Sequence, residues 1–297
     1  MQCPQPIFIR KTRMTVPCGK CAACRKRRAI EWVTRLQQEQ KYSRSCMFVT
    51  LTYSDQYLPI NDKGYETLKK TDLQAFINLL RQYAPFRYFA IGEYGDKGQR
   101  PHYHIIIFNF FPVVDPKENH IIYHKDWSKI TSQSLMSNVD IEAVIYKAWK
   151  KGKVQVENVT AGAIGYVANY TVDPSVREHE DIQAKIFAIM SKRPPIGHQY
   201  YQNKEIMRYH RYGKVEEMKD RFHYTNPDNG VIVHLPRMYR KKLYTDKERE
   251  KLNEMVQEDN IENLRKIKDV VKYSKNLYEA HEFENDKLNR RNPKRTI

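Results

Sequence analysis

The sequence predicts an α+β fold in which helices flank a mostly antiparallel central sheet. Strand-like and helix-like stretches alternate between residues 46 and 172 in the order strand, helix, hairpin, helix, strand, helix. The chain has 297 residues, of which 40% are hydrophobic, so it can bury a full core. We expect three parts: a Cys-rich basic segment and helix (1–40), the sheet domain (41–244) and a charged helical tail (245–297).

Amphipathic spacing and β-branched runs predict the elements of the first half. A helix is expected after the first 28 residues, with an apolar stripe at Ile30, Val33 and Leu36. Cys46–Tyr53 is rich in β-branched and aromatic residues and indicates a strand. Thr71–Gln74 has the form of a capping box that opens a helix. The apolar stripe of this second helix comprises Leu73, Phe76, Ile77 and Leu80.

Turn residues and further apolar runs predict the second half. The expected elements are strands Phe86–Tyr94 and His102–Phe111 around a turn at Gly95–Gly98, a helix Asp140–Trp149, a short strand Lys153–Val156 and a helix from about Thr160 to Val172. Asp173-Pro174 is expected to end that last helix. A second capping box, Thr245–Glu248, is expected to open the tail helix.

The charge of the chain favours a polyanionic partner, nucleic acid above all. Lys and Arg number 52 against 35 Asp and Glu, which gives a formal net charge of +17, and there are 21 Tyr and 11 Phe. The alternative is a generally basic soluble surface. No apolar run approaches the roughly 20 residues that span a bilayer, and the first residues lack a signal-peptide core. We therefore expect no membrane partner and a cytoplasmic location.

Two histidines on one strand form a candidate metal site. Alternate residues of a strand face the same way, so His102 and His104 project from one face. Pairing of the predicted hairpin could bring Glu93 beside them. Two imidazoles and a carboxylate suit Mn²⁺, Mg²⁺, Co²⁺ or Zn²⁺ and leave coordination positions open for substrate oxygens. The alternative is a pair of strand histidines that only pack or bind phosphate.

Two tyrosines in the predicted helix 160–172 are candidate nucleophiles. Tyr166 and Tyr170 stand four residues apart, which places both hydroxyls on one helical face. A phenol needs a metal or a base to ionise near neutral pH. The pair alone could be aromatic packing, but together with the two histidines it points to an enzyme that breaks and rejoins a DNA strand.

A cysteine cluster near the N-terminus is a candidate structural zinc site. Cys18, Cys21 and Cys24 are evenly spaced, and Cys3 could supply a fourth thiolate. Zinc spacings usually split two and two, so four free thiols are the alternative. Five cysteines in total, four of them before Arg25, argue against a secreted disulfide framework.

Basic residues beside aromatic ones are candidates for DNA contacts. The residues expected to bind DNA are Arg25, Lys26, Arg27, Arg28, Arg237, Tyr239 and Arg240. In the segment Leu235–Leu243 the aromatics are interleaved with cations, a composition that suits stacking on unpaired bases as well as phosphate contact. No Walker-type phosphate loop is present, so ATP-driven unwinding is not indicated.

Seven short motifs, in order along the chain, carry a resemblance to a known family. They are Val16–Cys24, Phe48–Tyr53, Gly92–Gly95, Arg100–His104, Gly165–Tyr170, Ser191–Gly197 and Leu235–Tyr239. Together they resemble the replication initiation proteins of small single-stranded DNA bacteriophages, the microviruses, and in particular the gokushovirus branch.

The resemblance implies a rolling-circle initiator of the His-hydrophobe-His (HUH) endonuclease superfamily. It implies a ferredoxin-like or RNA-recognition-motif-like catalytic sheet within residues 41–244. It carries over His102 and His104 as ligands of Mg²⁺ or Mn²⁺, and Tyr166 and Tyr170 as nucleophiles that form a 5′-phosphotyrosine. Glu93 is implied as the third ligand, although the position of the acidic ligand varies within the superfamily. The implied partners are single-stranded or supercoiled DNA at the viral origin, a host helicase and a host DNA polymerase, in the host bacterial cytoplasm.

One departure from the family concerns the tyrosine helix. Relatives often carry lysines just before and three residues after the second tyrosine, where this chain has Asn169 and Asp173. Their role would fall to Lys147, Lys150 or Lys151, or be absent, so the general acid or base stays open. The alternatives to an initiator are a non-catalytic single-stranded nucleic-acid-binding or packaging protein, and a transposase or relaxase of the same superfamily.

Overall fold

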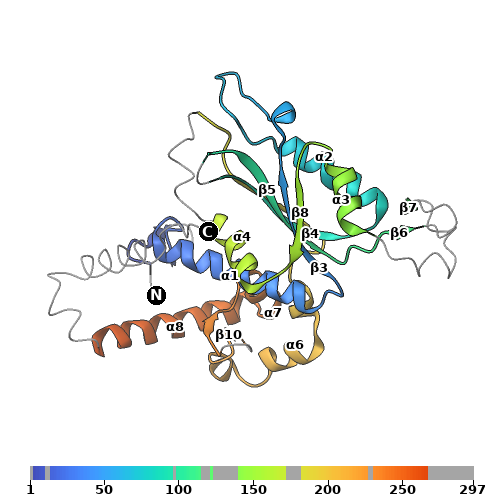
Figure 1. Ribbon diagram of the computed structural model, residues 1–297. Coiled ribbons are helices and arrows are strands. Elements are labelled where there is room, and N and C mark those ends of the chain that lie inside the picture. Colours follow the sequence, from blue (N-terminus) through green and yellow to red (C-terminus); the bar gives the residue numbers. More distant parts are fainter. Residues whose placement is uncertain are drawn as a thin grey trace. The chain divides into compact units, whose positions relative to one another are not determined.

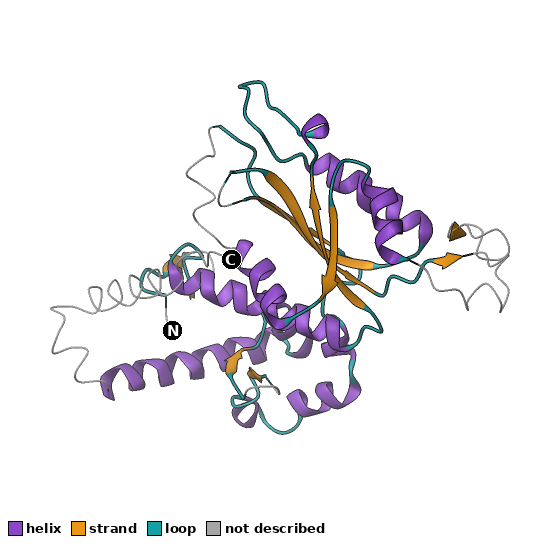
Figure 2. Cartoon of the chain, viewed as in Figure 1, coloured by secondary structure: helices purple, strands orange, loops and turns teal. Residues whose placement is uncertain are grey.

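The computed structural model describes residues 3–10, 14–95, 98–114, 121–122, 140–171, 182–226 and 230–266 (Figures 1 and 2). The chain divides into two compact units. One, the sheet unit, comprises Leu36–Ile196, and the other, the helical unit, comprises Met1–Arg35 with Gly197–Ile297. Within the described ranges, no helix is both long and apolar enough to cross a membrane. The three-part division predicted at residues 40 and 244 stays a prediction.

The sheet unit is built on a five-stranded antiparallel sheet, so the predicted α+β class is confirmed. The strand order is β8 (Val154–Asn158), β3 (Cys46–Thr52), β5 (Pro101–Phe108), β4 (Arg87–Tyr94) and β9 (Phe187–Met190). Leaving out the short pair β6 and β7, the chain runs β3, α2, β4, β5, α3, β8, and these four strands lie in the order 4-1-3-2 by sequence. This is the split βαβ arrangement of ferredoxin-like folds.

Helices α2 (Lys70–Tyr83) and α3 (Ile141–Trp149) pack together over one face of the sheet (Figure 1). The buried residues of α2 are the predicted ones, Leu73, Phe76, Ile77 and Leu80. They meet alternate residues of the strands, among them Leu51, Tyr103 and Ile105. The helices therefore cover the face toward which the odd-numbered residues of β5 point, and leave its even-numbered residues on the other face.

The predicted capping box at Thr71–Gln74 is wrong. Helix α2 begins at Lys70, and its N-cap residue is Lys69, which makes no side-chain cap hydrogen bond among the described residues. Tyr103 of β5 takes over part of this role: its hydroxyl accepts from the Lys69 amide (3.1 Å) and donates to the Lys69 carbonyl (2.9 Å). A tertiary contact has replaced the local cap.

Helix α4 (Ala161–Tyr170) contacts β4 from the opposite face of the sheet. The Thr160 hydroxyl accepts from the Ala163 amide (3.1 Å) and caps the helix start. Its buried residues are Ile164, Val167 and Ala168. The helix ends at Tyr170, with Thr171 as its C-cap, two residues before its predicted end, and Asp173-Pro174 lies outside the described residues.

The helical unit has a second core, composed mainly of aromatic residues. Its buried members are Tyr200, Met218, Phe222, Tyr224, Leu235, Tyr239, Leu243, Tyr244 and Leu252. The elements that supply them are α5 (Gln199–Gln202), η5 (Val215–Met218), β10 (His223–Thr225), β11 (Ile232–His234), α7 (Arg237–Leu243) and α8 (Asp246–Lys266), and α6 (Lys204–Arg211) packs beside them. The predicted capping box of the tail is confirmed, because Thr245 and Glu248 exchange side-chain and backbone hydrogen bonds at the start of α8.

The N-terminal part of the chain forms a short hairpin and one long helix. Strands β1 (Ile7–Ile9) and β2 (Met14–Val16) pair antiparallel, and α1 runs over Ala22–Lys41. This helix begins inside the cysteine segment and not after residue 28 as predicted. Of its predicted stripe, Leu36 is buried while Ile30 and Val33 are partly exposed.

Candidate metal and tyrosine site

Sheet register brings the two predicted histidines to a carboxylate. In the β4–β5 hairpin Glu93 lies directly opposite His102, and in the β3–β5 pair Thr50 lies opposite His104. The two imidazoles share a face, with ring centroids 4.9 Å apart. Their side chains are 17% and 12% exposed, so the site is open to solvent on one side.

Glu93 is the point on which the site converges. The Nε2 atoms of His102 and His104 each lie 2.9 Å from the same carboxylate oxygen, Oε1. The Glu93 residue is fully buried, and its second oxygen, Oε2, has no hydrogen-bond partner among the described residues. The ligand atoms of all three residues lie within 4.8 Å of one another.

The hydrogen bonds of the imidazoles indicate that the donor set suits a cation. The Nδ1 atom of His102 lies 3.0 Å from the Arg100 carbonyl, which can only accept, so Nδ1 carries the proton. In neutral His102 the Nε2 lone pair then faces a carboxylate oxygen, an arrangement that a bound cation between them would relieve. A second-atom contact that fixes the tautomer is usual for metal-binding histidine.

The carboxylate of Glu93 stays ionised despite its burial. Burial by itself raises the pKa of this group, but the hydrogen bonds from His102, His104 and Tyr166 outweigh it and lower the pKa to about 2. A buried anion with one unsatisfied oxygen attracts positive charge. The residues present therefore fit a divalent metal ion.

Both predicted tyrosines reach this site from α4. The Tyr166 hydroxyl donates to Glu93 Oε1 (2.5 Å), and its oxygen lies 3.2 Å from the Tyr170 hydroxyl oxygen. The Tyr166 ring also packs edge-on against His104, with centroids 5.3 Å apart. Burial, and then the negative charge of Glu93, raise the pKa of Tyr166 well above its usual value, so this phenol is protonated near neutral pH.

Sequence reasoning missed the groups that orient the imidazoles. Thr50 Oγ1 lies 2.9 Å from His104 Nδ1, and the Phe48 ring stacks on His104 with centroids 5.2 Å apart. Arg100 supplies the carbonyl that holds His102. All three flank the site by strand register, and that register could have identified them.

The lysines considered as substitutes for Asn169 and Asp173 are not brought to the site. Lys147, Lys150 and Lys151 belong to α3 or the turn after it, and α3 packs on the other face of the sheet. Lys151 lies 3.6 Å from Asp72 of α2. Asn169 is exposed on α4.

The stacking role predicted for Tyr239 disagrees with its position. This ring is 0% exposed and stacks on Tyr200 with centroids 4.5 Å apart, so it belongs to the core of the helical unit. Arg240 is partly buried, with its guanidinium over Phe222 and 4.0 Å from Glu31. Arg237 is exposed.

An exposed aromatic pair in α6 and the turn after it was missed by the sequence reasoning. Tyr209 and Tyr212 are 57% and 72% exposed. The Arg221 guanidinium donates to both of their carbonyl oxygens and lies 5.8 Å from the Tyr209 ring centroid. The segment Arg208–Tyr212 alternates cations with aromatics, the signal that was applied only to Leu235–Leu243.

Comparison with known proteins places the site in a family context. Residues 46–175 match the family model of the replication-associated protein ORF2. The chain is similar to phage replication-associated proteins. It is 34% identical to replication-associated protein ORF2 of Spiroplasma virus 4 over 177 residues, 57% of this chain and 52% of that protein. With replication-associated protein VP4 of Bdellovibrio phage phiMH2K it shares 32% over 164 residues, 52% of this chain and 47% of that protein.

These matches confirm the resemblance predicted from the motifs. A third relative, replication-associated protein ORF4 of Chlamydia phage 1, is 26% identical over 168 residues, 54% of this chain and 39% of that protein. The chain thus spans about half the length of the curated relatives it matches. No solved structure matches it. Glu93, both histidines and both tyrosines fall inside the matched range 46–175, whereas the four clustered cysteines precede it.

Proposed function

We propose that this protein is a rolling-circle replication initiator that nicks and rejoins single-stranded DNA through a metal-assisted tyrosine. The observation that carries the proposal is the convergence of His102, His104 and the Tyr166 hydroxyl on one oxygen of Glu93. The names of the similar phage proteins, all replication-associated, support a role in replication.

In this proposal His102, His104 and Glu93 hold one divalent cation, Mg²⁺ or Mn²⁺. Such an ion would polarise the scissile phosphate and neutralise charge that develops in the transition state. The chain's own contribution is to fix the imidazoles through Arg100 and Thr50 and to place a phenol beside the ligands.

The proposed chemistry is transesterification at phosphorus. The Tyr166 hydroxyl oxygen bonds to the phosphorus, the bond from phosphorus to the 3′ oxygen breaks, and the phenol proton ends on that oxygen. A 5′-phosphotyrosine and a 3′-hydroxyl result, and a 3′-hydroxyl can reverse the step without ATP because the ester is retained. Tyr170, with its oxygen 3.2 Å away, would perform the second transfer.

In replication the released 3′ end would prime a host polymerase while a host helicase opens the duplex. We place these steps at the viral origin, in the cytoplasm of the bacterial host.

The test is a cleavage assay with 5′- and 3′-labelled phage single strands, with Mn²⁺ or with EDTA. A covalent adduct on the 5′ end that needs Mn²⁺ is expected, and Tyr166→Phe with Tyr170→Phe should abolish it. Tyr146→Phe is the matched control, because Tyr146 is 59% exposed on α3 and lies outside the site. Adducts that persist in the double variant would refute the nucleophile assignment.

The exposed pair Tyr209 and Tyr212 also favours a second function, binding of single strands without cleavage. Exposed rings beside arginines suit stacking on unpaired bases and contact with phosphates. In the nickase proposal this surface holds the substrate strand. If the same assay shows tight binding but no metal-dependent adduct, the protein is a binder alone.

A further inference from the structure

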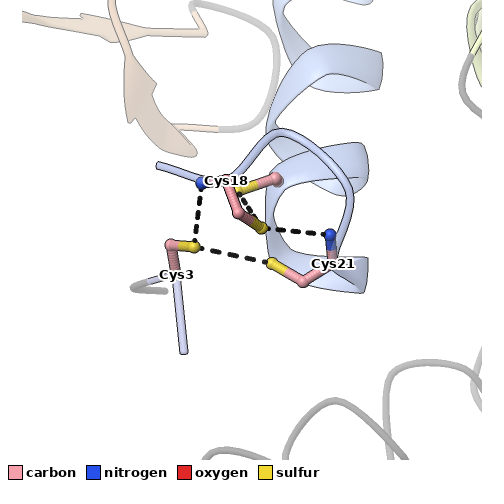
Figure 3. Close-up of side chains that lie close together, drawn as sticks. Cys3, Cys18 and Cys21 are labelled. Atoms are coloured by element: carbon pink, nitrogen blue, oxygen red, sulfur yellow. Dashed lines mark hydrogen bonds between the residues drawn. The ribbon is translucent and has the colours of Figure 1, made fainter. Parts of the chain in front are cut away.

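Four cysteines meet at the start of α1, outside the site described above. Cys3 comes from the segment before the β1–β2 hairpin, Cys18 and Cys21 from the turn after it, and Cys24 from the first turn of α1. Their sulfurs all lie within 4.8 Å of one another. Figure 3 shows the side chains of Cys3, Cys18 and Cys21 turned toward one another.

The spacing of the sulfurs suits a single ion and excludes disulfides. The Cys3 and Cys21 sulfurs are 3.9 Å apart and those of Cys18 and Cys24 are 4.0 Å apart. A disulfide would bring sulfurs to about 2.0 Å. Four thiolates arranged as a tetrahedron around zinc, at about 2.3 Å from it, have neighbouring sulfurs about 3.8 Å apart. The observed values are close to that edge length.

Backbone amides point at the same sulfurs. Cys18 Sγ lies 3.4 Å from the amides of both Lys20 and Cys21, and Cys3 Sγ accepts from the amide of Cys18 at 3.2 Å. Amide donors stabilise negative charge on sulfur, and thiolate is the form that binds metal. Gly19 has a φ of +75°, which lets the turn between Cys18 and Cys21 bend back in this way.

The cluster supplies what the local fold lacks. Strand β1 exposes Ile7, Phe8 and Ile9 at 51%, 59% and 40%, so the β1–β2 hairpin has little core of its own. A two-stranded hairpin is marginal in water without such a core. An ion bound by Cys3 and by Cys18–Cys24 would join both ends of this hairpin to the start of α1.

We propose that Cys3, Cys18, Cys21 and Cys24 bind one zinc ion as a closed structural site that holds the N-terminal hairpin on α1. Four thiolates and Zn²⁺ carry a net charge of about −2. The positive end of the α1 dipole and the cations that follow, including exposed Lys26 and Arg28, would balance it. All four coordination positions are filled by protein, which leaves none for substrate.

The first experiment measures metal in the full chain, purified without chelators. We expect about one zinc per chain in His102→Ala/His104→Ala protein, whose other candidate site is disabled. Cys21→Ser should lose this zinc. Cys46→Ser is the matched control, because Cys46 lies in β3 outside the cluster, and it should keep the zinc. Absence of zinc, or its retention in Cys21→Ser, would overturn the proposal.

Because Cys21→Ser could simply misfold, a second measurement uses unaltered cysteines. Replacement of zinc by Co²⁺ should give thiolate-to-metal charge-transfer bands and the visible spectrum of a tetrahedral ion. Removal of the metal should increase the rate of proteolysis between residues 3 and 24. A brown protein with iron and sulfide, a Co²⁺ spectrum without thiolate bands, or unchanged proteolysis would each count against the structural zinc assignment.

Discussion

The two candidate metal sites of this chain differ in almost every physical respect. The His102–His104–Glu93 site is formed by neighbouring strands, has one carboxylate oxygen without a hydrogen-bond partner in the described structure, and has two phenols beside it. The cysteine cluster joins residues up to 21 positions apart, offers four soft ligands and has no reactive group beside it among the described residues.

The difference suggests how a chain separates chemistry from architecture. Nitrogen and oxygen donors from three residues leave coordination positions for substrate, whereas four sulfurs complete a tetrahedron. The first set rests on a sheet whose other face is covered by α2 and α3, so its geometry survives without an ion. The second rests on a hairpin with exposed apolar residues, where an ion would supply the stability itself.

The largest expected effect separates the two sites. His102→Ala/His104→Ala should lower metal-dependent cleavage by about 10³-fold, because an ion contributes several kcal/mol to the transition state. The same protein should keep the Co²⁺ spectrum of the cysteine cluster. Single-turnover cleavage and absorption spectra of one preparation measure both. Loss of the thiolate bands in this variant would show that the sites are not independent.

A smaller effect is expected where the strand is held but not cut. Tyr209→Ala/Tyr212→Ala should weaken binding of a labelled single strand by about 10- to 100-fold, since each base stacked on an aromatic ring contributes about 1–3 kcal/mol. Fluorescence anisotropy gives the Kd, and Tyr146→Ala is the control for loss of an exposed ring. An unchanged Kd would remove this surface from the proposed substrate path.

The next effect concerns the groups that orient the metal ligands. Thr50→Ala should raise the Mn²⁺ concentration that supports half-maximal cleavage by about 10- to 100-fold, with little loss of rate at saturating Mn²⁺, because the Thr50 hydroxyl only positions His104. Exposed Thr225 of β10 provides the control variant Thr225→Ala. A fall in the saturated rate without a shift in Mn²⁺ dependence would contradict a positioning role.

The sequence predicted the sheet unit well because its signals are local and repeat at regular intervals. Strand alternation placed His102 and His104 on one face, and helical spacing placed Tyr166 beside Tyr170. The failures arose where a distant contact replaced a local one. Tyr103 caps α2 in place of Thr71, and the aromatic core of the helical unit buries Tyr239, which looked like a surface residue beside its basic neighbours. Burial of that kind depends on residues 200 to 252 folding together, which no local pattern shows.

The smallest expected effect concerns the stability of the helical unit in acid. His210 of α6 is fully buried between the hydroxyls of Tyr200 (2.9 Å) and Tyr244 (2.7 Å). Burial lowers its pKa from 6.5 to about 4. The unfolded chain therefore binds a proton that the folded chain does not, and the stabilisation present above pH 6.5 is lost as the pH falls toward 4.

This loss should reach about 2 kcal/mol by pH 5, measured as the free energy of unfolding in urea at pH 7 and pH 5. In His210→Gln the amide can still bond both tyrosines but does not titrate, so the difference between the two pH values should shrink by that amount. The Glu93 carboxylate, whose pKa is lowered to about 2, stays ionised throughout this range and adds almost nothing to the difference. Acid between pH 6.5 and pH 4 thus distinguishes the two units by a buried base in one and a buried anion in the other. An equal pH dependence in wild type and His210→Gln would show that His210 is not the group responsible.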